Sequence, residues 1–175
     1  MVAGGNSRRK MKMSFVVFLD IDGVLNTRTT CERTPSYYHG VDDSRAELLS
    51  KAMKTVGASG VVLTTDWKTL KEDDEDFIYL KRKLGKQGIY ILGKTEEKRA
   101  SDREEGVKDY LEEHPEIDEF VILDDNKFDF DRYDNLWERF LFTDGRGIEN
   151  AVDLSGTPRV EAIVFLDAIK EADKP

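Results

Sequence analysis

The sequence has few of the residues that form disulfides or zinc sites. It contains one cysteine, Cys31, so no disulfide can form within the chain. Its two histidines, His39 and His114, lie far apart, and no cysteine or histidine stands at the spacing of a zinc site. We therefore expect neither a zinc centre nor a disulfide framework. A lone thiol fits a reducing compartment, and we expect a cytoplasmic protein.

Long hydrophobic runs are also missing. No apolar stretch approaches the roughly 20 residues of a membrane-spanning helix, so we expect no membrane partner. Residues 1–13 contain basic side chains but no acid, and they lack the apolar core of a signal peptide. We interpret residues 1–13 as a flexible basic tail and residues 14–175 as a single domain.

The balance of charge is acidic. The chain carries 36 acidic and 27 basic residues, with a formal net charge of −9. An acidic body disfavours broad electrostatic attraction to nucleic acid, although it leaves room for a local basic patch. It also suits a protein that binds metal cations. Hydrophobic residues make up 39% of the chain, which is enough for one domain with a core of its own.

Apolar runs alternate with amphipathic stretches along the chain. Continuous apolar runs such as SFVVFLD, at residues 14–20, are typical of strands that are covered on both faces. We expect strands at residues 14–20, 60–65, 88–92, 119–125 and 138–144, and helices at residues 42–57, 66–88, 101–114 and 157–172. This alternation predicts an α/β fold, a three-layer α/β/α sandwich with a mostly parallel, Rossmann-like sheet.

Three local features of these helices are expected. The acidic run at residues 72–76 is interpreted as a solvated face of the second helix. Ser101 and Glu104 have the spacing of a capping box at the start of the third helix. Pro158 is expected in the first turn of the last helix, where its missing N–H is tolerated.

Acidic side chains follow two of the predicted strands at their carboxyl ends. Asp20 and Asp22 follow the first strand, and Asp124 and Asp125 end the fourth. Ligands of parallel sheets bind beyond these ends, and carboxylates that converge there repel one another unless a cation binds. A ligand set made only of oxygen atoms favours Mg²⁺ over zinc. The sequence therefore predicts a magnesium site whose candidate ligands are Asp20, Asp22, Asp124 and Asp125.

Several segments together resemble a known enzyme family. FLDIDGVLN, at residues 18–26, resembles motif I, DxDGxxN, of the haloacid dehalogenase (HAD) superfamily of phosphohydrolases. Three further segments resemble its other motifs: VVLTTDW motif II, DREEGVKDYL the helix of the basic motif III, and VILDDN the acidic motif IV. With FTDGRGI, the pattern is similar to the HAD domain of multi-domain RNA-repair proteins. The resemblance covers residues 14–172 and implies a HAD-like phosphatase.

The resemblance implies a role for each residue of motif I. Asp20 would be the nucleophile and would form an aspartyl-phosphate. Asp22 would act as general acid and then as general base, and its main-chain carbonyl would also bind Mg²⁺. Gly23 would let the chain turn sharply, and Asn26 would brace the loop.

Motifs II and III would contact the phosphoryl group of the substrate. Thr65 would hydrogen-bond this group, and we prefer it to Thr64 because the family pattern places one residue between the hydroxyl and Trp67. Arg103 would offset the negative charge of the phosphoryl group as the basic residue of motif III. Three other basic residues of this stretch are alternatives to Arg103: Lys98, Arg99 and Lys108.

The two acids of motif IV are expected to differ in role. One would bind Mg²⁺ directly, and we favour Asp125. The other, Asp124, would act through water or would hold the basic residue of motif III.

One further motif is interpreted as a chance match. GIYILGKT, at residues 88–95, fits the P-loop pattern GxxxxGK[ST], whose variable residues must form a loop between a strand and a helix. Here those residues are Ile, Tyr, Ile and Leu, which favour a strand. We therefore expect no ATP site there, and we expect Lys94 to contact no phosphate.

The spacing of the motifs predicts an open site. Only 45 positions separate Asp20 from Thr65, and 38 separate Thr65 from Arg103, too few for a full cap domain in either gap. The loop at residues 27–41 is the candidate flap. It offers four side chains that would meet a nucleotide: Arg28, Arg33, Tyr37 and Tyr38.

An open site suits a large phosphorylated substrate. The first hypothesis is a Mg²⁺-dependent phosphomonoester hydrolase that acts on RNA or DNA ends or on nucleotides. Two alternatives remain at this point. One is a phosphoprotein phosphatase, and the other is a non-catalytic binding or scaffold protein with a HAD fold.

Overall fold

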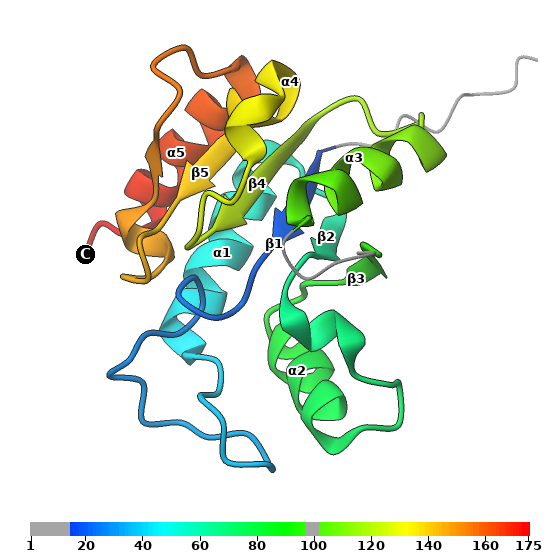
Figure 1. Ribbon diagram of the computed structural model, residues 1–175. Helices are drawn as coiled ribbons and strands as arrows, with labels where there is room; N and C mark the ends of the chain where they lie inside the picture. Colours follow the sequence, from blue (N-terminus) through cyan, green and yellow to red (C-terminus); the bar gives the residue numbers. More distant parts are fainter. Residues whose placement is uncertain (1–14, 97–101) are drawn as a thin grey trace, which may run out of the picture.

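The computed structural model describes residues 15–96 and 102–175. Within these ranges the strands form one sheet in the order β3-β2-β1-β4-β5-β6 (Figure 1). Neighbouring strands from β3 to β5 are parallel, and β6 is antiparallel to β5. The strands are β1 (Val16–Leu19), β2 (Gly60–Leu63), β3 (Ile91–Lys94), β4 (Phe120–Asp124), β5 (Phe140–Phe142) and β6 (Val152–Asp153).

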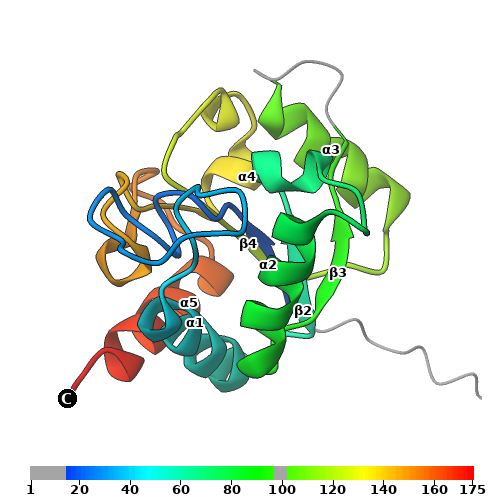
Figure 2. The same cartoon turned by 90° about the horizontal axis from the view of Figure 1, so that it is seen from below.

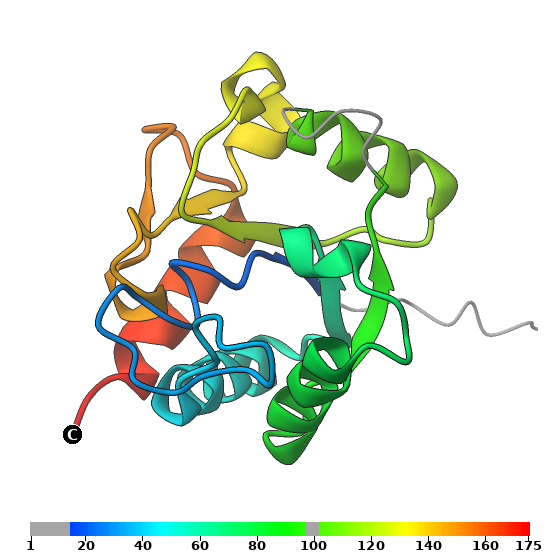
Figure 3. The same ribbon diagram turned by 60° about the horizontal axis from the view of Figure 1, so that its bottom comes forward.

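Helices cover both faces of this sheet (Figures 2 and 3). One layer contains α1 (Asp43–Val56), α2 (Glu75–Lys86) and α5 (Val160–Ala172), and the other contains α3 (Arg103–Glu113) and the short α4 (Asp134–Trp137). Short 3₁₀ helices lie in the connections: η1 (Asp66–Thr69), η2 (Phe130–Arg132) and η3 (Ile148–Asn150). The predicted α/β sandwich is confirmed. Within the described ranges no helix is long and apolar enough to cross a membrane.

The alternation of side chains along β1 divides the core into two clusters. Val17 and Leu19 pack in the cluster that includes α1, α2 and α5, whereas Val16 and Phe18 pack with residues of α3 and α4. All four side chains are fully buried. Because both faces of the strand are covered, its sequence is a continuous apolar run.

The acidic run before α2 is not the solvated helix face that the sequence predicted. Residues 66–69 form η1, and α2 begins at Glu75. Asp74 caps this helix, because its carboxylate accepts the backbone N–H of Asp76 at 2.9 Å. Asp76 is buried and accepts the backbone N–H of Ser36 at 3.0 Å. The run therefore starts the helix and ties it to the loop after β1.

Strand β3 lies further along the chain than predicted. Gly88 has a φ of +71°, and the N–H of Ile89 still bonds to Leu84 in the last turn of α2. The strand therefore begins at Ile91, within the P-loop-like segment. The Nζ atom of Lys94 donates to the carbonyl oxygen of Leu70 at 3.1 Å, so the amine is held by a neighbouring loop. The segment is a turn followed by a strand, which is not the geometry of a P-loop.

Helices α3 and α5 also begin later than predicted. Helix α3 begins at Arg103, and the expected cap Ser101 lies outside the described residues, as do Lys98, Arg99 and the expected tail at residues 1–13. Helix α5 begins at Val160, because Arg159 still has an extended backbone with φ −68° and ψ 160°. The expectation that Pro158 stands in the first turn is therefore wrong.

Candidate active site

Three carboxylates converge where β1 and β4 end. The two strands are adjacent and parallel, so Asp20 leaves β1 beside Asp124, the last residue of β4. Carboxylate oxygens of Asp20, Asp124 and Asp125 all lie within 4.8 Å of one another. Asp20 is 3% exposed and Asp124 is fully buried. The sheet thus brings together acids that are about one hundred residues apart in the sequence.

Arg103 enters this cluster from the first turn of α3. Its Nη1 atom lies 2.9 Å from Oδ2 of Asp124 and 3.3 Å from Oδ1 of Asp20. Its Nη2 atom lies 3.5 Å from Oδ1 of Asp66. The guanidinium carbon also stands 4.5 Å from the centre of the Phe128 ring. Among residues 15–96 and 102–175, Arg103 is therefore the basic residue that contacts Asp20 and Asp124.

Of the three alternatives to Arg103, Lys108 is the one that lies in the described part of the chain, and its side chain points away from the acidic cluster. Lys108 lies one turn further along α3, with a side chain that is 42% exposed. Its Nζ atom is 3.8 Å from Glu112 and 5.5 Å from the centre of the Tyr133 ring. These contacts keep Lys108 on the outer surface of α3.

Burial and mutual repulsion shift the protonation of the clustered acids. Burial, followed by the charge of Asp124, raises the pKa of Asp20 well above its usual value, although Arg103 opposes this shift. Burial also raises the pKa of Asp124 to about 7, again against the effect of Arg103. One guanidinium therefore does not balance these carboxylates. Three oxygen ligands at this separation fit a hard divalent cation, which would supply the missing positive charge.

The loop after β1 holds Asp22 at the edge of the cluster. Nδ2 of Asn26 donates to Oδ1 of Asp22 at 2.9 Å and to the carbonyl oxygen of Gly40 at 2.8 Å. The indole N–H of Trp67 donates to the other oxygen of Asp22 at 3.2 Å. The side-chain oxygen of Asn26 accepts the N–H of Gly23 at 3.0 Å. Asp22 is exposed to solvent, yet both of its oxygens have a fixed donor.

Gly23 occupies a position that a larger residue cannot take. Its φ is +83°, and a Cβ atom there would lie 2.5 Å from Oδ2 of Asp125. Its carbonyl oxygen accepts the Thr143 hydroxyl at 2.8 Å and the Gly147 N–H at 3.1 Å. The glycine therefore lets the two acidic loops approach each other.

The two threonines after β2 have different surroundings. Thr65 is 1% exposed and its hydroxyl accepts the N–H of Trp67 at the start of η1. Its side chain also lines the pocket beside Asp20. The hydroxyl of Thr64 is buried and has no hydrogen-bond partner within residues 15–96 and 102–175. The structure thus places Thr65, rather than Thr64, at the site.

A pocket of about 420 Å³ opens above the cluster. It contains most of the side chains that the sequence suggested, but it also has lining residues that the sequence did not suggest. Its lining comprises Asp20, Asp22, Thr65, Asp66, Arg103, Asp125, Asn126, Lys127, Phe128 and Phe142. Gly23 and Asn26 line a neighbouring cavity instead. Asp124 lines neither and lies beneath the pocket, where it binds Arg103.

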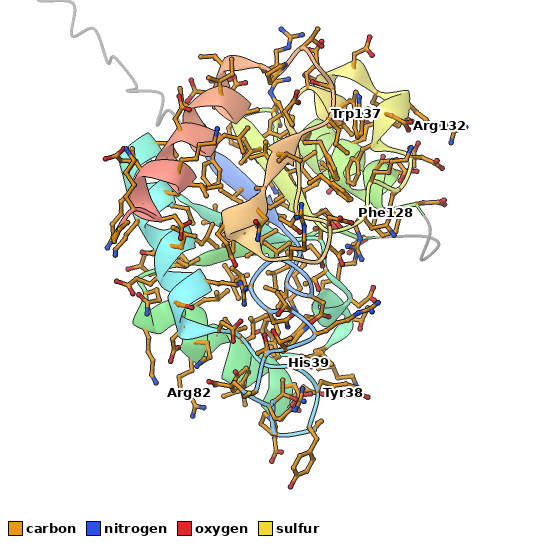
Figure 4. All side chains as sticks on the ribbon, turned by 90° about the vertical axis from the view of Figure 1, so that its left-hand side faces the viewer. Tyr38, His39, Arg82, Phe128, Arg132 and Trp137 are labelled. Atoms are coloured by element: carbon orange, nitrogen blue, oxygen red, sulfur yellow. The ribbon has the colours of Figure 1, made fainter. Side chains whose placement is uncertain are left out.

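Most of the lining residues that the sequence did not suggest come from one segment, and the others are Asp66 of η1 and Phe142 of β5. Asn126, Lys127 and Phe128 directly follow the motif IV acids, and this adjacency was the available signal. Phe128 has a φ of +41°. Figure 4 shows Phe128 apart from Tyr38 and His39, which lie lower in that view. Phe142 reaches the pocket from β5 and is the first residue of the FTDGRGI segment, which was quoted only as part of the family pattern.

A family model described as the HAD domain in Swiss Army Knife RNA repair proteins matches residues 16–151. This match spans more than half of the 175 residues. The chain belongs to this family. The searches of curated proteins and of solved structures returned no match. The resemblance inferred from the motifs is confirmed, and every residue of the HAD domain that lines the pocket falls inside the matched range.

The candidate flap of the HAD domain is a hairpin fixed at its base. A bridge between Arg33 and His39 closes it, and the Tyr79 hydroxyl donates to Glu32 at 2.7 Å. The same hydroxyl accepts the N–H of Val41 at 3.0 Å, so α2 holds both sides of the loop.

The tip of this hairpin stands away from the pocket. Tyr37 and Tyr38 are 85% and 70% exposed, and neither they nor Arg33 line the pocket. Of the four flap residues that the sequence suggested for nucleotide contacts, Arg28 alone lines the cavity next to the pocket.

Proposed function

We propose that the protein is a Mg²⁺-dependent phosphomonoester hydrolase that acts through an aspartyl-phosphate. The observation that carries this proposal is the convergence of Asp20, Asp124 and Asp125 within 4.8 Å, with Arg103 beside them, under an accessible pocket. Membership in a HAD family supports the same chemistry. Clustered carboxylates with raised pKa values occur at sites that bind cations or transfer groups.

A bound Mg²⁺ would be held by Asp20, Asp125 and the main-chain carbonyl of Asp22, and it would offset the negative charge of the phosphoryl group. Asp125 is the better direct ligand of the motif IV pair, because it lines the pocket. Asp124 instead accepts the hydrogen bond from Arg103 at 2.9 Å. Asp124 therefore contributes by holding the guanidinium and by adding negative charge near the cation.

The chain's own residues account for two chemical steps. A carboxylate oxygen of Asp20 attacks phosphorus, the bond from phosphorus to the ester oxygen breaks, and Asp22 gives its proton to the departing oxygen. Asp22 then takes a proton from a water molecule, whose oxygen attacks phosphorus and releases inorganic phosphate from Asp20. Thr65 donates a hydrogen bond to the phosphoryl group during both steps.

The substrate is proposed to be the terminal phosphate of an RNA or DNA strand, or a nucleotide. The description of the family as part of RNA repair proteins supports this class. We also propose that the domain works without a full cap. Between β1 and α1, the described secondary structure is the single bridge of the hairpin, which leaves room for a large substrate.

The direct test is hydrolysis of an aryl phosphate, with Mg²⁺ and with EDTA, by the wild-type protein and by Asp20→Asn. We expect turnover that requires Mg²⁺, and a covalent phosphoenzyme in the wild type that is missing from Asp20→Asn. Turnover in EDTA would contradict the role of the cation. Tight binding of phosphate or phosphorylated ligands without any turnover would favour the non-catalytic alternative.

A panel of substrates then tests the substrate class. Phosphorylated oligonucleotides, mononucleotides and phosphopeptides are compared by kcat/KM. We expect the oligonucleotides to react at least as well as the mononucleotides, because no full cap excludes them. Preference for phosphopeptides would favour a phosphoprotein phosphatase.

A further inference from the structure

A second cavity, of about 800 Å³, adjoins the pocket. Asp22 and Asp125 line both the pocket and the second cavity. The two cavities therefore meet at these two residues. The outer part of the second cavity lies between the loop after β1 and the turn after β5. These two segments, blue and orange in Figure 3, lie side by side. We refer to this outer part, with Arg28, Arg45 and Arg146, as the arginine groove.

Arginine side chains gather in the arginine groove, on a chain whose net charge is negative. Apart from the two acids that it shares with the pocket, its lining contains three arginines and one acid, Asp144. The chain as a whole has a net charge of −9. A local basic surface on an acidic protein, directly beside a candidate phosphatase site, indicates an anionic ligand that extends beyond the phosphoryl group.

Two of the three arginines are available to such a ligand. Arg45 is bound by Asp42 and by Glu149, at 2.6 Å from the latter, and serves the fold. Arg28 is exposed and has no ion pair or hydrogen bond from its side chain within residues 15–96 and 102–175. Arg146 is 63% exposed and lies 3.9 Å from Asp144, a separation at which an exposed pair contributes little.

The backbone that carries these two arginines is held in place. The turn that contains Arg28 is closed by the N–H of Thr27, which donates to the Thr30 hydroxyl at 2.8 Å. The N–H of Arg146 bonds to Thr143, and the next residue bonds to the carbonyl of Gly23. The first turn thus belongs to the loop that carries Asp22, and the second is bonded to this loop. Fixed backbones reduce the entropy lost when a charged ligand binds.

We propose that the arginine groove binds the phosphodiester backbone of the polynucleotide whose terminal phosphate occupies the pocket. This inference rests on the proposed function and specifies its substrate as a strand with at least one internal phosphate. Guanidinium groups bind phosphate oxygens through paired hydrogen bonds, and a polynucleotide repeats its charge at every residue. A single phosphorylated side chain on a peptide would occupy the pocket and leave the two arginines without anionic partners.

The test compares the double variant Arg28→Ala/Arg146→Ala with a matched control, Arg82→Ala/Arg132→Ala. The control removes the same charge from two exposed arginines that line neither hollow. Each protein is assayed on a terminally phosphorylated single-stranded oligonucleotide and on an aryl phosphate, over a range of salt concentrations. The ratio of the two kcat/KM values is the readout.

We expect the groove variant to lose selectivity for the oligonucleotide and to lose salt dependence. Two phosphate contacts on a single strand contribute a slope of about 1.4 in a plot of log affinity against log salt. Between 50 and 200 mM salt, the wild type should therefore lose about sevenfold more oligonucleotide activity than the groove variant. The control variant should keep the slope of the wild type.

Three results would overturn the inference. They are equal losses of the groove variant on both substrates, an unchanged salt slope of the groove variant, and the same loss of selectivity in the control variant. If the wild type hydrolyses neither substrate, the proposed function fails by itself. The groove is then tested by binding of the same oligonucleotide, measured by fluorescence anisotropy, with the same expected difference in salt slope.

Discussion

The Nη1 atom of Arg103 lies 2.9 Å from Oδ2 of Asp124, and this buried ion pair joins the first turn of α3 to the end of β4. The same nitrogen is 3.3 Å from Asp20, so one guanidinium contacts two of the three clustered acids. Asp124 is fully buried and does not line the pocket. Its position therefore distinguishes the two acids of motif IV: Asp124 holds Arg103, and Asp125 lines the pocket.

Replacing Arg103 tests its role in catalysis. Arg103→Ala should lower kcat/KM for an aryl phosphate on the order of 10²-fold or more, as removal of one fixed electrostatic donor commonly does. Arg103→Lys keeps the charge but loses the planar guanidinium, and it should lie between the wild type and Arg103→Ala. Steady-state kinetics, with circular dichroism to confirm folding, measure both effects.

Two lysines serve as controls for Arg103. Lys108→Ala removes an exposed cation from the same helix, and Lys94→Ala removes the amine of the P-loop-like segment. Each should change turnover by less than about tenfold, or 1.4 kcal/mol of barrier. A larger loss for either lysine than for Arg103 would contradict the assignment of motif III.

Asp22 is expected to transfer the proton to the leaving group. Asp22→Asn should slow turnover by about 10²–10⁴-fold, with the smallest loss for esters whose leaving groups are very acidic. Trp67→Phe removes the indole donor that lies 3.2 Å from Asp22, and it should produce a smaller loss with the same trend. The measurement is kcat/KM across a series of aryl and alkyl phosphates. Equal losses across the series would exclude proton transfer by Asp22.

Gly23 is expected to permit the close approach of the two acidic loops, because it has no side chain. Gly23→Ala adds a Cβ atom 2.5 Å from Asp125 at a φ of +83°, so it should lower both stability and Mg²⁺ affinity. Gly57→Ala is the matched control, because Gly57 has a φ of +72° with no atom within 4 Å of the added Cβ. Gly57→Ala should lower the free energy of unfolding by about 1 kcal/mol, from backbone strain alone. Urea unfolding and Mg²⁺ titration compare them, and equal behaviour of the two variants would contradict the steric argument.

The metal-free protein should lose stability as the pH rises. Folding raises the pKa of Asp20, and it raises the pKa of Asp124 to about 7. Aspartate side chains of the unfolded chain have a pKa of about 4. The folded state therefore binds more protons between these values. Its extra stability is fully present below about pH 4 and is lost as the pH rises through about 7.

Urea unfolding in EDTA at pH 6 and pH 8 measures this effect. Glu32 and Asp43 titrate below this interval, because Lys83 lowers the pKa values of both carboxyl groups. Their contribution to stability is lost only in acid, so it does not change between pH 6 and pH 8. Mg²⁺ should reduce the difference, because the cation replaces the protons, and Asp125→Asn should reduce it by removing one repelling charge. Equal or greater stability at pH 8 in EDTA would contradict the prediction.

Local patterns in the sequence were sufficient for β1, for β4 and for the acids that follow them. A strand buried on both faces must be apolar along its whole length, so β1 and β4 were visible as runs that end in Asp20 and Asp124. The boundaries of α2 and β3 were predicted wrongly, because they depend on contacts outside the local pattern. Asp76 accepts a hydrogen bond from Ser36, forty residues earlier, and β3 begins where its residues pair with β2.

The sequence by itself determined the fold class, the family and the residue types of the site, because these follow from periodicity and from short motifs. Only the tertiary structure shows that Asp125 and Thr65 line the pocket, whereas Asp124 and Thr64 do not. Neighbouring residues on a strand or at its end point in opposite directions, and the sheet register decides which one faces the pocket. The arginine groove likewise joins Arg28 to Arg146 through strand pairing that no local pattern encodes.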